Sequence, residues 1–406
     1  MKLDPIALAI PFFFLLIGIE IVVMRRQGRR LYRFADTIAC LSCGIGSEVV
    51  RIFLGLAGLL AYSWVYGNFR LLDLASYPVA AWVIGFIGVD FFYYWFHRLS
   101  HEINVLWAMH VVHHQSQDYN LAVALRQSWF QGFAATPIYF PLALIGVPPL
   151  VFAGCAAASL LYQFWIHTRT IGRLPGWYEA VMNTPSHHRV HHGINPEYID
   201  RNHAGVFIVW DKLFGTFEPE GAEPVYGTVK PYASWNPVWA NFDYWRDLRD
   251  RSRKISRLAD RLHLWFADPA WQPAELGGPQ PAPPVEASRF VKWDTQFPHR
   301  YKAYINFHFV SVGLGLTLML LFREVLGWAA VSVISLLVVV TTAVWGGLME
   351  DKSWARPVEW FRLAAIGAVA TGALFMGYPA AMAAGLGLVA LAGMIWFPRL
   401  SAAGIR

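Results

Sequence analysis

The sequence predicts an all-α, polytopic membrane protein. Of its 406 residues, 56% are hydrophobic and only 15% are charged, whereas soluble globular proteins carry roughly 25% charged residues. The apolar residues are also clustered, because residues 76–96 contain one acidic or basic side chain and residues 328–349 contain none. A helix of about 20 apolar residues spans the hydrocarbon core of a bilayer. This composition excludes a disordered chain or a coiled coil, and it disfavours an ordinary water-soluble enzyme.

Three spanning helices are expected at the start of the chain, at about residues 5–24, 36–64 and 76–96. A run of arginines separates the first two: Arg25, Arg26, Arg29, Arg30 and Arg33. Basic residues collect on the cytoplasmic side of membrane proteins, so this run predicts that the third helix returns to the cytoplasm near Phe96. The same rule explains the net charge of +6, and no nucleic-acid partner is expected.

A hydrophobic hairpin is expected over residues 129–166. The pair Pro148-Pro149 stops a helix, so this stretch is interpreted as a helix, a turn and a returning helix. Both ends of such a hairpin face one membrane surface. His167 is therefore expected at the same surface as His97.

The rest of the chain alternates between polar and apolar character. Residues 170–305 are polar enough to lie outside the membrane, with a basic helical stretch at 246–261 and a Pro-rich linker at 268–284. Four more spans are then expected, at residues 306–322, 327–349, 357–377 and 378–397.

Histidines gather in three short motifs between residues 97 and 203. The first has H-x-x-x-H spacing and the other two have H-x-x-H-H spacing: His97 and His101; His110, His113 and His114; His188, His191 and His192. Residues three or four apart share a face of a helix, so each motif is expected to present its imidazoles to one point. His167 and His187 are further candidates, whereas three distant histidines are interpreted as structural: His263, His299 and His308.

These motifs predict a metal site. Imidazole is the commonest protein ligand of iron, zinc and copper, and eight imidazoles suit two ions better than one. A zinc-protease motif after His101-Glu102 is absent, because position 105 is Val105. Cys40 and Cys43 have C-x-x-C spacing inside an apolar segment, which indicates helix packing. The prediction is a polytopic membrane helical bundle with a cytoplasmic helical cap holding a His-rich dimetal site.

The membrane setting indicates which metal is expected. A substrate reaching this site from the bilayer is a lipid with an aliphatic chain. Attack on an unactivated C–H bond needs an oxidant, which redox-inert zinc cannot generate and iron with O₂ can. The sequence therefore predicts a di-iron oxygenase acting on a membrane lipid.

The three motifs, in this order among membrane helices, resemble the fatty acid hydroxylase/sterol desaturase superfamily. Longer segments are similar to the alkylglycerol monooxygenase family within it: Asn183-Thr-Pro-Ser-His187-His188 and residues 90–102, 118–128, 162–168 and 210–216. The resemblance covers about residues 80–245. It implies hydroxylation of the carbon next to an alkylglycerol ether oxygen, followed by collapse to a fatty aldehyde and a glycerol derivative.

The resemblance also implies a set of cofactors and ligands. The cofactors are two ferrous ions (Fe²⁺), O₂, and tetrahydrobiopterin or another electron donor, with a separate electron-transfer partner as one possible source. The metal ligands it implies are His97, His101, His110, His113, His114, His188, His191 and His192, with His167 and His187 as additional candidates. Independently of the resemblance, the apolar segments and the arginine run predict an integral, multi-pass protein of a bacterial inner membrane or the endoplasmic reticulum, with the active site on the cytoplasmic side.

Four other residues have open roles. Glu102 matches a glutamate that is linked to pterin use in the family, or it orients a ligand histidine. Arg126 binds the pterin or a substrate head group, or it contacts lipid phosphate. His203 stands where a tyrosine or phenylalanine is more usual, and we interpret it as a neutral replacement rather than an added ligand. Asp90 is an ionisable residue at membrane depth, and such residues are expected to be functional. The alternative is a structural contact with Tyr94, one helical turn further on.

The expected organisation has four parts: N-terminal transmembrane helices at 1–75, a fatty acid hydroxylase-like catalytic core at 76–245, a cytoplasmic basic and Pro-rich linker at 246–305, and C-terminal transmembrane helices at 306–406. Two other functions stay open. One is a hydroxylase or desaturase of sterols, fatty acids or carotenoids that uses a separate electron carrier. The other is a non-catalytic membrane metal-binding or transport protein.

Overall fold

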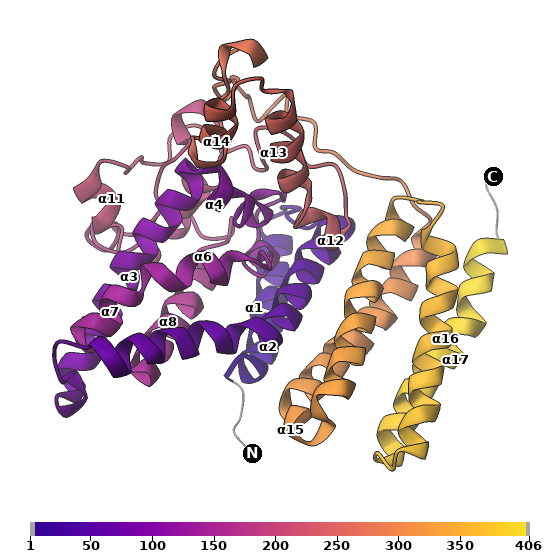
Figure 1. The fold of residues 1–406 in the computed structure, drawn as a ribbon. Helices are drawn as coiled ribbons and strands as arrows, with labels where there is room; N and C mark the ends of the chain where they lie inside the picture. Colours follow the sequence, from indigo (N-terminus) through magenta and orange to yellow (C-terminus); the bar gives the residue numbers. More distant parts are fainter. Residues whose placement is uncertain (1–4, 403–406) are drawn as a thin grey trace. The chain divides into compact units, whose positions relative to one another are not determined.

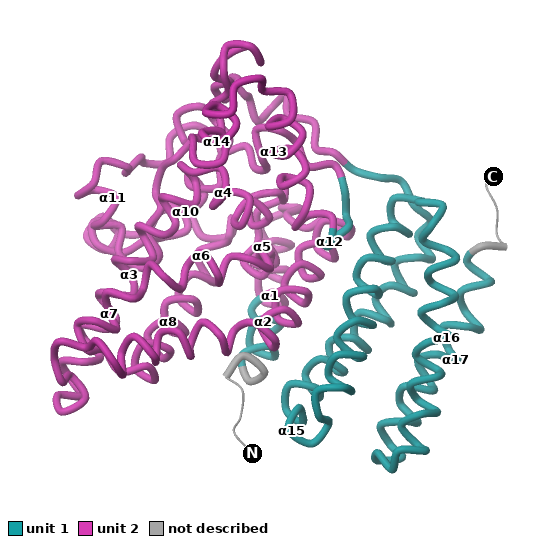
Figure 2. The backbone as a smooth tube through the Cα atoms, viewed as in Figure 1, with its two compact units in different colours: residues 1–16, 234–238, 294–406 teal, residues 17–233, 239–293 magenta. Residues whose placement is uncertain are grey.

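The structure is a computed structural model that describes residues 5–402, and over that range it is helical, without a β-strand. The chain forms two compact units (Figure 2), one from residues 17–233 and 239–293, the other from the described parts of residues 1–16, 234–238 and 294–406. Within the described chain, five helices are long and apolar enough to cross a membrane: Phe34–Phe69, Pro78–Glu102, His299–Met349, Ala355–Phe375 and Ala380–Leu400. The all-α, polytopic membrane class is confirmed.

The first three predicted spans correspond to helices α1 (Pro5–Arg26), α2 (Phe34–Phe69) and α3 (Pro78–Glu102), with the short 3-10 helix η1 (Leu74–Ser76) before α3. Helix α3 begins at a proline, whose fixed φ suits a first helical position and whose missing N–H is not needed there. It runs without interruption to Glu102 and so carries the first histidine motif on its last turns.

The predicted hairpin consists of α6 (Gln131–Ile138), α7 (Phe140–Ile145) and α8 (Pro149–Trp165). Gly146 ends α7 with φ +102°, and a β-carbon there would lie 2.1 Å from the Leu72 carbonyl oxygen. Only glycine allows both the positive φ and this close approach. The hairpin packs against α2 and α3 through a buried cluster that includes Tyr62, Val89 and Leu142, and this packing directs the end of α8 toward the end of α3.

Short helices outside the membrane helices carry the remaining motifs: α4 (Asn104–Ala108), η2 (Val111–His114), α5 (Leu121–Ala124), α9 (Gly176–Glu179), α10 (Pro185–His191), η3 (Pro196–Tyr198), α11 (Val209–Phe214), α12 (Pro237–Ala240), α13 (Asp243–Lys254), α14 (Leu258–Phe266) and η4 (Ala274–Leu276). The basic stretch 246–261 is not one helix, because the backbone turns extended at Ile255 between α13 and α14. Ile255 is buried with Leu248, Leu264 and Ala108 of α4. These two helices lie beside α4 as a cap at the end of α3 (Figure 1).

The other unit contains α15 (His299–Met349), α16 (Ala355–Phe375) and α17 (Ala380–Ala402). The backbone of α15 is broken at Gly327, where φ is +72°, at the boundary between the predicted spans 306–322 and 327–349. Arg362 donates to Glu359 at 2.6 Å, and the hydroxyl of Tyr304 donates to the same carboxylate. This buried pair satisfies charges that would be costly in a membrane helix.

Candidate metal centre

The first histidine motif lies at the end of α3. His97 and His101 are one helical turn apart and both are buried. The Nδ1–H of His97 donates to the backbone carbonyl of His203 at 2.7 Å. Because this bond uses the Nδ1 proton, the Nε2 atom of His97 is left with its lone pair available.

The second and third motifs do not each face a single point, contrary to the expectation from their spacing. His113 and His114 lie in the 3-10 helix η2, and His191 and His192 lie at the end of α10. Adjacent residues in such helices are rotated by about 100–120° around the axis. The two members of each His-His pair therefore point to different places.

The histidines form two buried clusters whose ligand atoms, within each cluster, all lie within 4.8 Å of one another. The first cluster contains His97, His101, His110, His114 and His191, and the second contains His113, His167, His188 and His192. Each His-His pair contributes one ring to each cluster. The structure thus brings nine of the ten predicted metal-site histidines into two groups.

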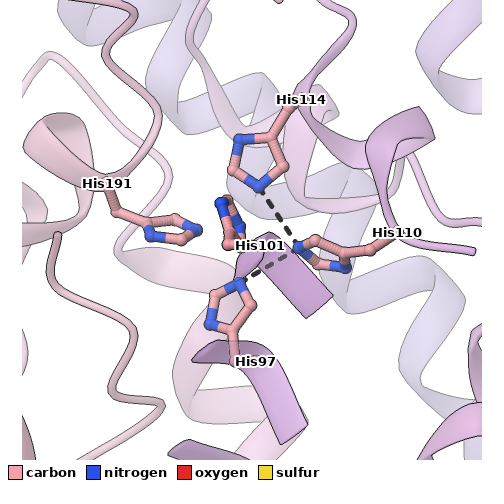
Figure 3. A group of neighbouring side chains, drawn as sticks. All are labelled: His97, His101, His110, His114 and His191. Carbon is pink, nitrogen blue, oxygen red and sulfur yellow. Dashed lines mark hydrogen bonds between the residues drawn. The ribbon is translucent and has the colours of Figure 1, made fainter. Parts of the chain in front are cut away.

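The spacing within the clusters matches that of ligands around one ion. In the first, His110 Nε2 lies 3.1 Å from His97 Nε2 and 3.2 Å from His114 Nε2 (Figure 3). In the second, His167 Nε2 lies 3.2 Å from His113 Nε2 and 3.0 Å from His188 Nε2. Two nitrogens bound at a right angle to one ion, each about 2.1 Å from it, stand about 3 Å apart. Each cluster could hold one metal ion.

Backbone carbonyls orient several of these rings. Besides His97, three histidines donate Nδ1–H to a carbonyl: His113 to Arg126 at 3.0 Å, His167 to Gln163 at 2.8 Å and His191 to Arg201 at 3.0 Å. Metal-binding histidines characteristically donate their second ring N–H in this way, which fixes the tautomer and the ring direction. In all four rings, Nε2 is the atom left to face the cluster.

Burial keeps the cluster imidazoles outside the membrane helices neutral. It lowers the pKa of His113 to about 4. Burial, together with neighbouring imidazoles, holds the pKa well below its usual value at His110, His114, His167, His188, His191 and His192. The neutral imidazole is the form that binds a metal, so the clusters present lone pairs.

Two candidate histidines lie outside both clusters. His187 is buried, but its ring packs edge-on against Phe217 with 5.4 Å between centroids. His203 acts through its backbone, since its carbonyl accepts from His97 and its N–H donates to Asp211 at 2.7 Å. The ring of His203 lies near the first cluster, 5.1 Å from the His101 ring.

The carboxylate nearest a cluster histidine was missed by sequence reasoning. Glu102 pairs with Arg98 at 2.8 Å and its side chain is 35% exposed. Asp200 is the residue that approaches a cluster, with Oδ1 3.8 Å from His101 Nδ1. Burial raises the pKa of Asp200 to about 7, and the nearby carboxylates of Asp268 and Glu102 add to the effect. Asp200 has φ +56° in an irregular turn, where no periodic pattern marks it.

Arg126 is buried behind the second motif. Its Nε donates to the Val112 carbonyl at 2.6 Å and its Nη2 to Gln115 Oε1 at 2.7 Å. The guanidinium also lies over the ring of Tyr232, 5.9 Å from its centroid. With its own carbonyl accepting from His113, Arg126 holds the segment that carries η2. These contacts direct the guanidinium into the protein.

Two buried aspartates hold the loop around His203. Asp90 accepts from Val206 N at 2.7 Å and from Phe207 N and Trp210 Nε1 at 2.9 Å. Asp211 accepts from the backbone N–H groups of His203 and Ala204. The Tyr94 hydroxyl contacts Thr216, at 3.0 Å, instead of Asp90. Asp90 therefore fixes this loop to α3, whose last turns carry His97.

Comparison with known proteins gives consistent matches. The sequence model of the family described as Fatty acid hydroxylase matches residues 82–216. The chain is 37% identical over 359 residues to an alkylglycerol monooxygenase of Danio rerio, covering 87% of this chain and 79% of that protein. It is 37% identical over 369 residues to an alkylglycerol monooxygenase of Homo sapiens, covering 88% and 81%. No solved structure matches the chain significantly.

The helical membrane fold and the paired histidine clusters define a membrane lipid monooxygenase of the fatty acid hydroxylase superfamily. Such an enzyme is an oxidoreductase that uses O₂, and iron dependence fits both the family and the clusters. It is an integral, multi-pass membrane protein. Within that superfamily, the chain belongs to the alkylglycerol monooxygenase family.

Proposed function

We propose that the protein hydroxylates an alkylglycerol at the carbon next to the ether oxygen, using two irons, O₂ and a reduced pterin. One oxygen atom would enter the C–H bond and the other would leave as water, with two electrons and two protons drawn from the tetrahydropterin as it is oxidised to the dihydro level. The hemiacetal then collapses to a fatty aldehyde and a glycerol derivative. The substrate is taken from the relatives, which are named for alkylglycerols and align over 87% and 88% of this chain.

The observation that carries the proposal is the division of nine neutral imidazoles into two clusters. We assign one iron to His97, His101, His110, His114 and His191, and the other to His113, His167, His188 and His192. His187 is left out because its ring packs against Phe217. An iron pair held by neutral ligands supplies the activation of O₂ that attack on a C–H bond requires.

The residues of the chain position and shield this chemistry. Backbone carbonyls at residues 126, 163, 201 and 203 fix the ring tautomers, as described above. The histidine side chains of both clusters are buried, which limits the contact of the site with bulk water and so the side reactions of an oxidant. The proposed catalytic core, residues 76–245, contains every histidine of both clusters.

The proposed orientation places the metal centre at the cytoplasmic surface of a bacterial inner membrane or the endoplasmic reticulum. Its support is the arginine run that separates α1 from α2, at residues 25–33. By the positive-inside rule this run lies in the cytoplasm. α3 then ends at the same surface, with His97 and His101 on its last turns.

The experiment uses the full chain, purified in detergent and loaded with iron. We expect consumption of O₂ and release of a fatty aldehyde from a 1-O-alkylglycerol when tetrahydrobiopterin is supplied. Activity with reduced ferredoxin and not with the pterin would replace the proposal with a carrier-fed hydroxylase or desaturase. Iron binding without oxygen consumption under either donor would indicate a non-catalytic metal protein.

A further inference from the structure

A cavity of about 350 Å³ adjoins the first histidine cluster. It is lined by His101, His114 and His191 of that cluster and by His192 of the second, among other residues. Ligand-binding pockets usually have volumes of about 300–1,000 Å³, so this one is large enough for a bicyclic heterocycle. A molecule bound there would lie directly beside the proposed iron ligands.

The walls of the cavity come from the extramembranous part of the chain. Its lining begins at His101, on the last turn of α3, and continues through residues 107–115, 191–200, 227–251 and 268–282. The spanning part of α2 and the hairpin helices α6–α8 contribute nothing to this lining. A ligand that enters here comes from the side of the cap, which is the route for a water-soluble molecule.

Two carboxylates line the cavity close to the clusters. Asp200 lies 3.8 Å from His101, and among the described residues the only hydrogen bond to the Asp268 side chain comes from the backbone N–H of Ala270, at 2.8 Å. Within residues 5–402, neither is paired with a lysine or arginine. The other two lining aspartates are paired, since Asp247 contacts Lys230 and Arg251 and Asp243 contacts Arg246. Asp200 and Asp268 are therefore the lining carboxylates that can accept from the N–H donors of a ligand.

An aromatic side chain also lines the cavity. Trp107 of α4 lines it and contacts two rings of the first cluster, with centroid distances of 4.8 Å to His101 and 5.4 Å to His114. Aromatic faces bind planar heterocycles by stacking. A ring stacked on Trp107 would lie one side chain away from the ligands of the proposed iron.

We propose that this cavity is the binding site of the reduced pterin, with Asp200 and Asp268 accepting hydrogen bonds from its N3–H and 2-amino groups and Trp107 facing its ring. The inference rests on the proposed use of a pterin and adds where it binds. It assigns recognition to Asp200 and Asp268 and not to Glu102, which pairs with Arg98 and is absent from the lining. A reduced pterin held by these residues would supply two electrons beside the first cluster.

The first test is binding without turnover. Full-length protein in lipid nanodiscs is titrated by calorimetry with oxidised pterin (2-amino-4-oxopteridine) and with lumazine, which has an oxygen in place of the 2-amino group. We expect pterin to bind more tightly than lumazine. Asp200→Asn and Asp268→Asn should each weaken pterin binding about tenfold or more, as loss of a hydrogen bond to a charged group does. The variant whose carboxylate accepts from the 2-amino group should leave lumazine binding nearly unchanged, whereas the variant whose carboxylate accepts from N3–H should weaken both ligands, because lumazine retains N3–H.

The matched control is Asp250→Asn, which removes an exposed carboxylate of α13 that pairs with Arg249 and does not line the cavity. This variant should bind pterin as the parent protein does. Iron content is measured in all three variants, because Asp200 lies near His101 and its replacement could disturb the metal site. Asp268 has no such contact, so a change in pterin binding in Asp268→Asn reports on the cavity alone. Equal affinity for pterin and lumazine, or unchanged pterin affinity in both cavity variants, would overturn the inference.

A kinetic experiment separates this inference from the proposed function. With iron-loaded Asp268→Asn, the KM for tetrahydrobiopterin should rise while the KM for a 1-O-alkylglycerol stays constant. If the parent enzyme turns over with pterin and this KM does not move, only the placement of the pterin is wrong. If the parent enzyme does not use pterin at all, the proposed function itself fails. Displacement of oxidised pterin by the alkylglycerol would assign the cavity to the lipid.

Discussion

The Nδ1–H of His97 donates a hydrogen bond to the backbone carbonyl of His203 across 2.7 Å. This contact joins the last turns of α3 to a loop more than a hundred residues later in the chain. The backbone N–H of His203 in turn donates to the buried carboxylate of Asp211. The direction of one metal-site ring is therefore set by the backbone of a loop, and that loop is held by Asp211 and Asp90.

Because His203 acts through its carbonyl, its side chain is expected to be replaceable. His203→Phe should keep iron content within experimental error and activity within about twofold, since the contacts by which His203 holds the site are made by its backbone carbonyl and N–H. Iron analysis and initial rates of aldehyde release measure the two quantities. Loss of iron in this variant would instead make the His203 ring a ligand of the first cluster.

Each cluster should lose its own ion when one of its members is removed. His191→Ala in the first cluster and His113→Ala in the second should each remove about one iron per chain. Activity should fall by more than about 100-fold, because even residues that merely support a ligand cost 10–100-fold when changed. His263→Ala, at an exposed ring of α14 outside both clusters, is the control and should retain both irons. Full iron in both cluster variants would disprove the ligand assignment.

His167 and His187 provide a sharper comparison, since both are buried and both were candidates from sequence. His167 Nε2 lies 3.0 Å from His188 Nε2, whereas the His187 ring packs on Phe217. His167→Gln is expected to lower iron content and His187→Gln to retain it. Metal analysis of the two variants, prepared side by side, decides the matter. Equal loss in both would mean that His187 also binds an ion.

Acid should destabilise the iron-free protein. An unfolded histidine has a pKa of about 6.5, while burial lowers the pKa of His113 to about 4 and that of His187 to about 4. Between these values the unfolded state binds more protons, so the free energy of unfolding falls as pH falls. The Tm of the chelated protein should drop between pH 6.5 and 4, because the buried histidines outnumber Asp200, whose raised pKa of about 7 acts in the opposite sense. A Tm that rises with acidification would contradict neutral, buried imidazoles.

Much of the architecture could be predicted from the sequence because hydrophobic periodicity and proline positions are local signals. These signals predict the membrane segments and the turn at Pro148–Pro149. They also predict that His97 and His167 lie at the same end of the bundle. The break between the spans 306–322 and 327–349 occurs at Gly327, where positive φ requires a glycine. These features depend on a few neighbouring residues.

Features that depend on distant parts of the chain could not be predicted. The spacing of His113 and His114 gives no sign that their rings diverge into separate clusters, because that depends on a 3-10 turn braced by Arg126. The contact of Asp200 with His101 needs an irregular turn with positive φ. Ile255 divides the basic stretch because it is buried against Ala108 of α4, and no local pattern specifies that contact.

The central claim is that two ions are bound by separate sets of imidazoles. X-ray absorption at the iron K-edge, combined with metal analysis, tests it most directly on the loaded protein. We predict about two irons per chain with nitrogen scatterers at about 2.1 Å, the distance of an imidazole ligand, and one remaining iron in His113→Ala. A single iron per chain, or a first shell dominated by sulfur, would contradict the account.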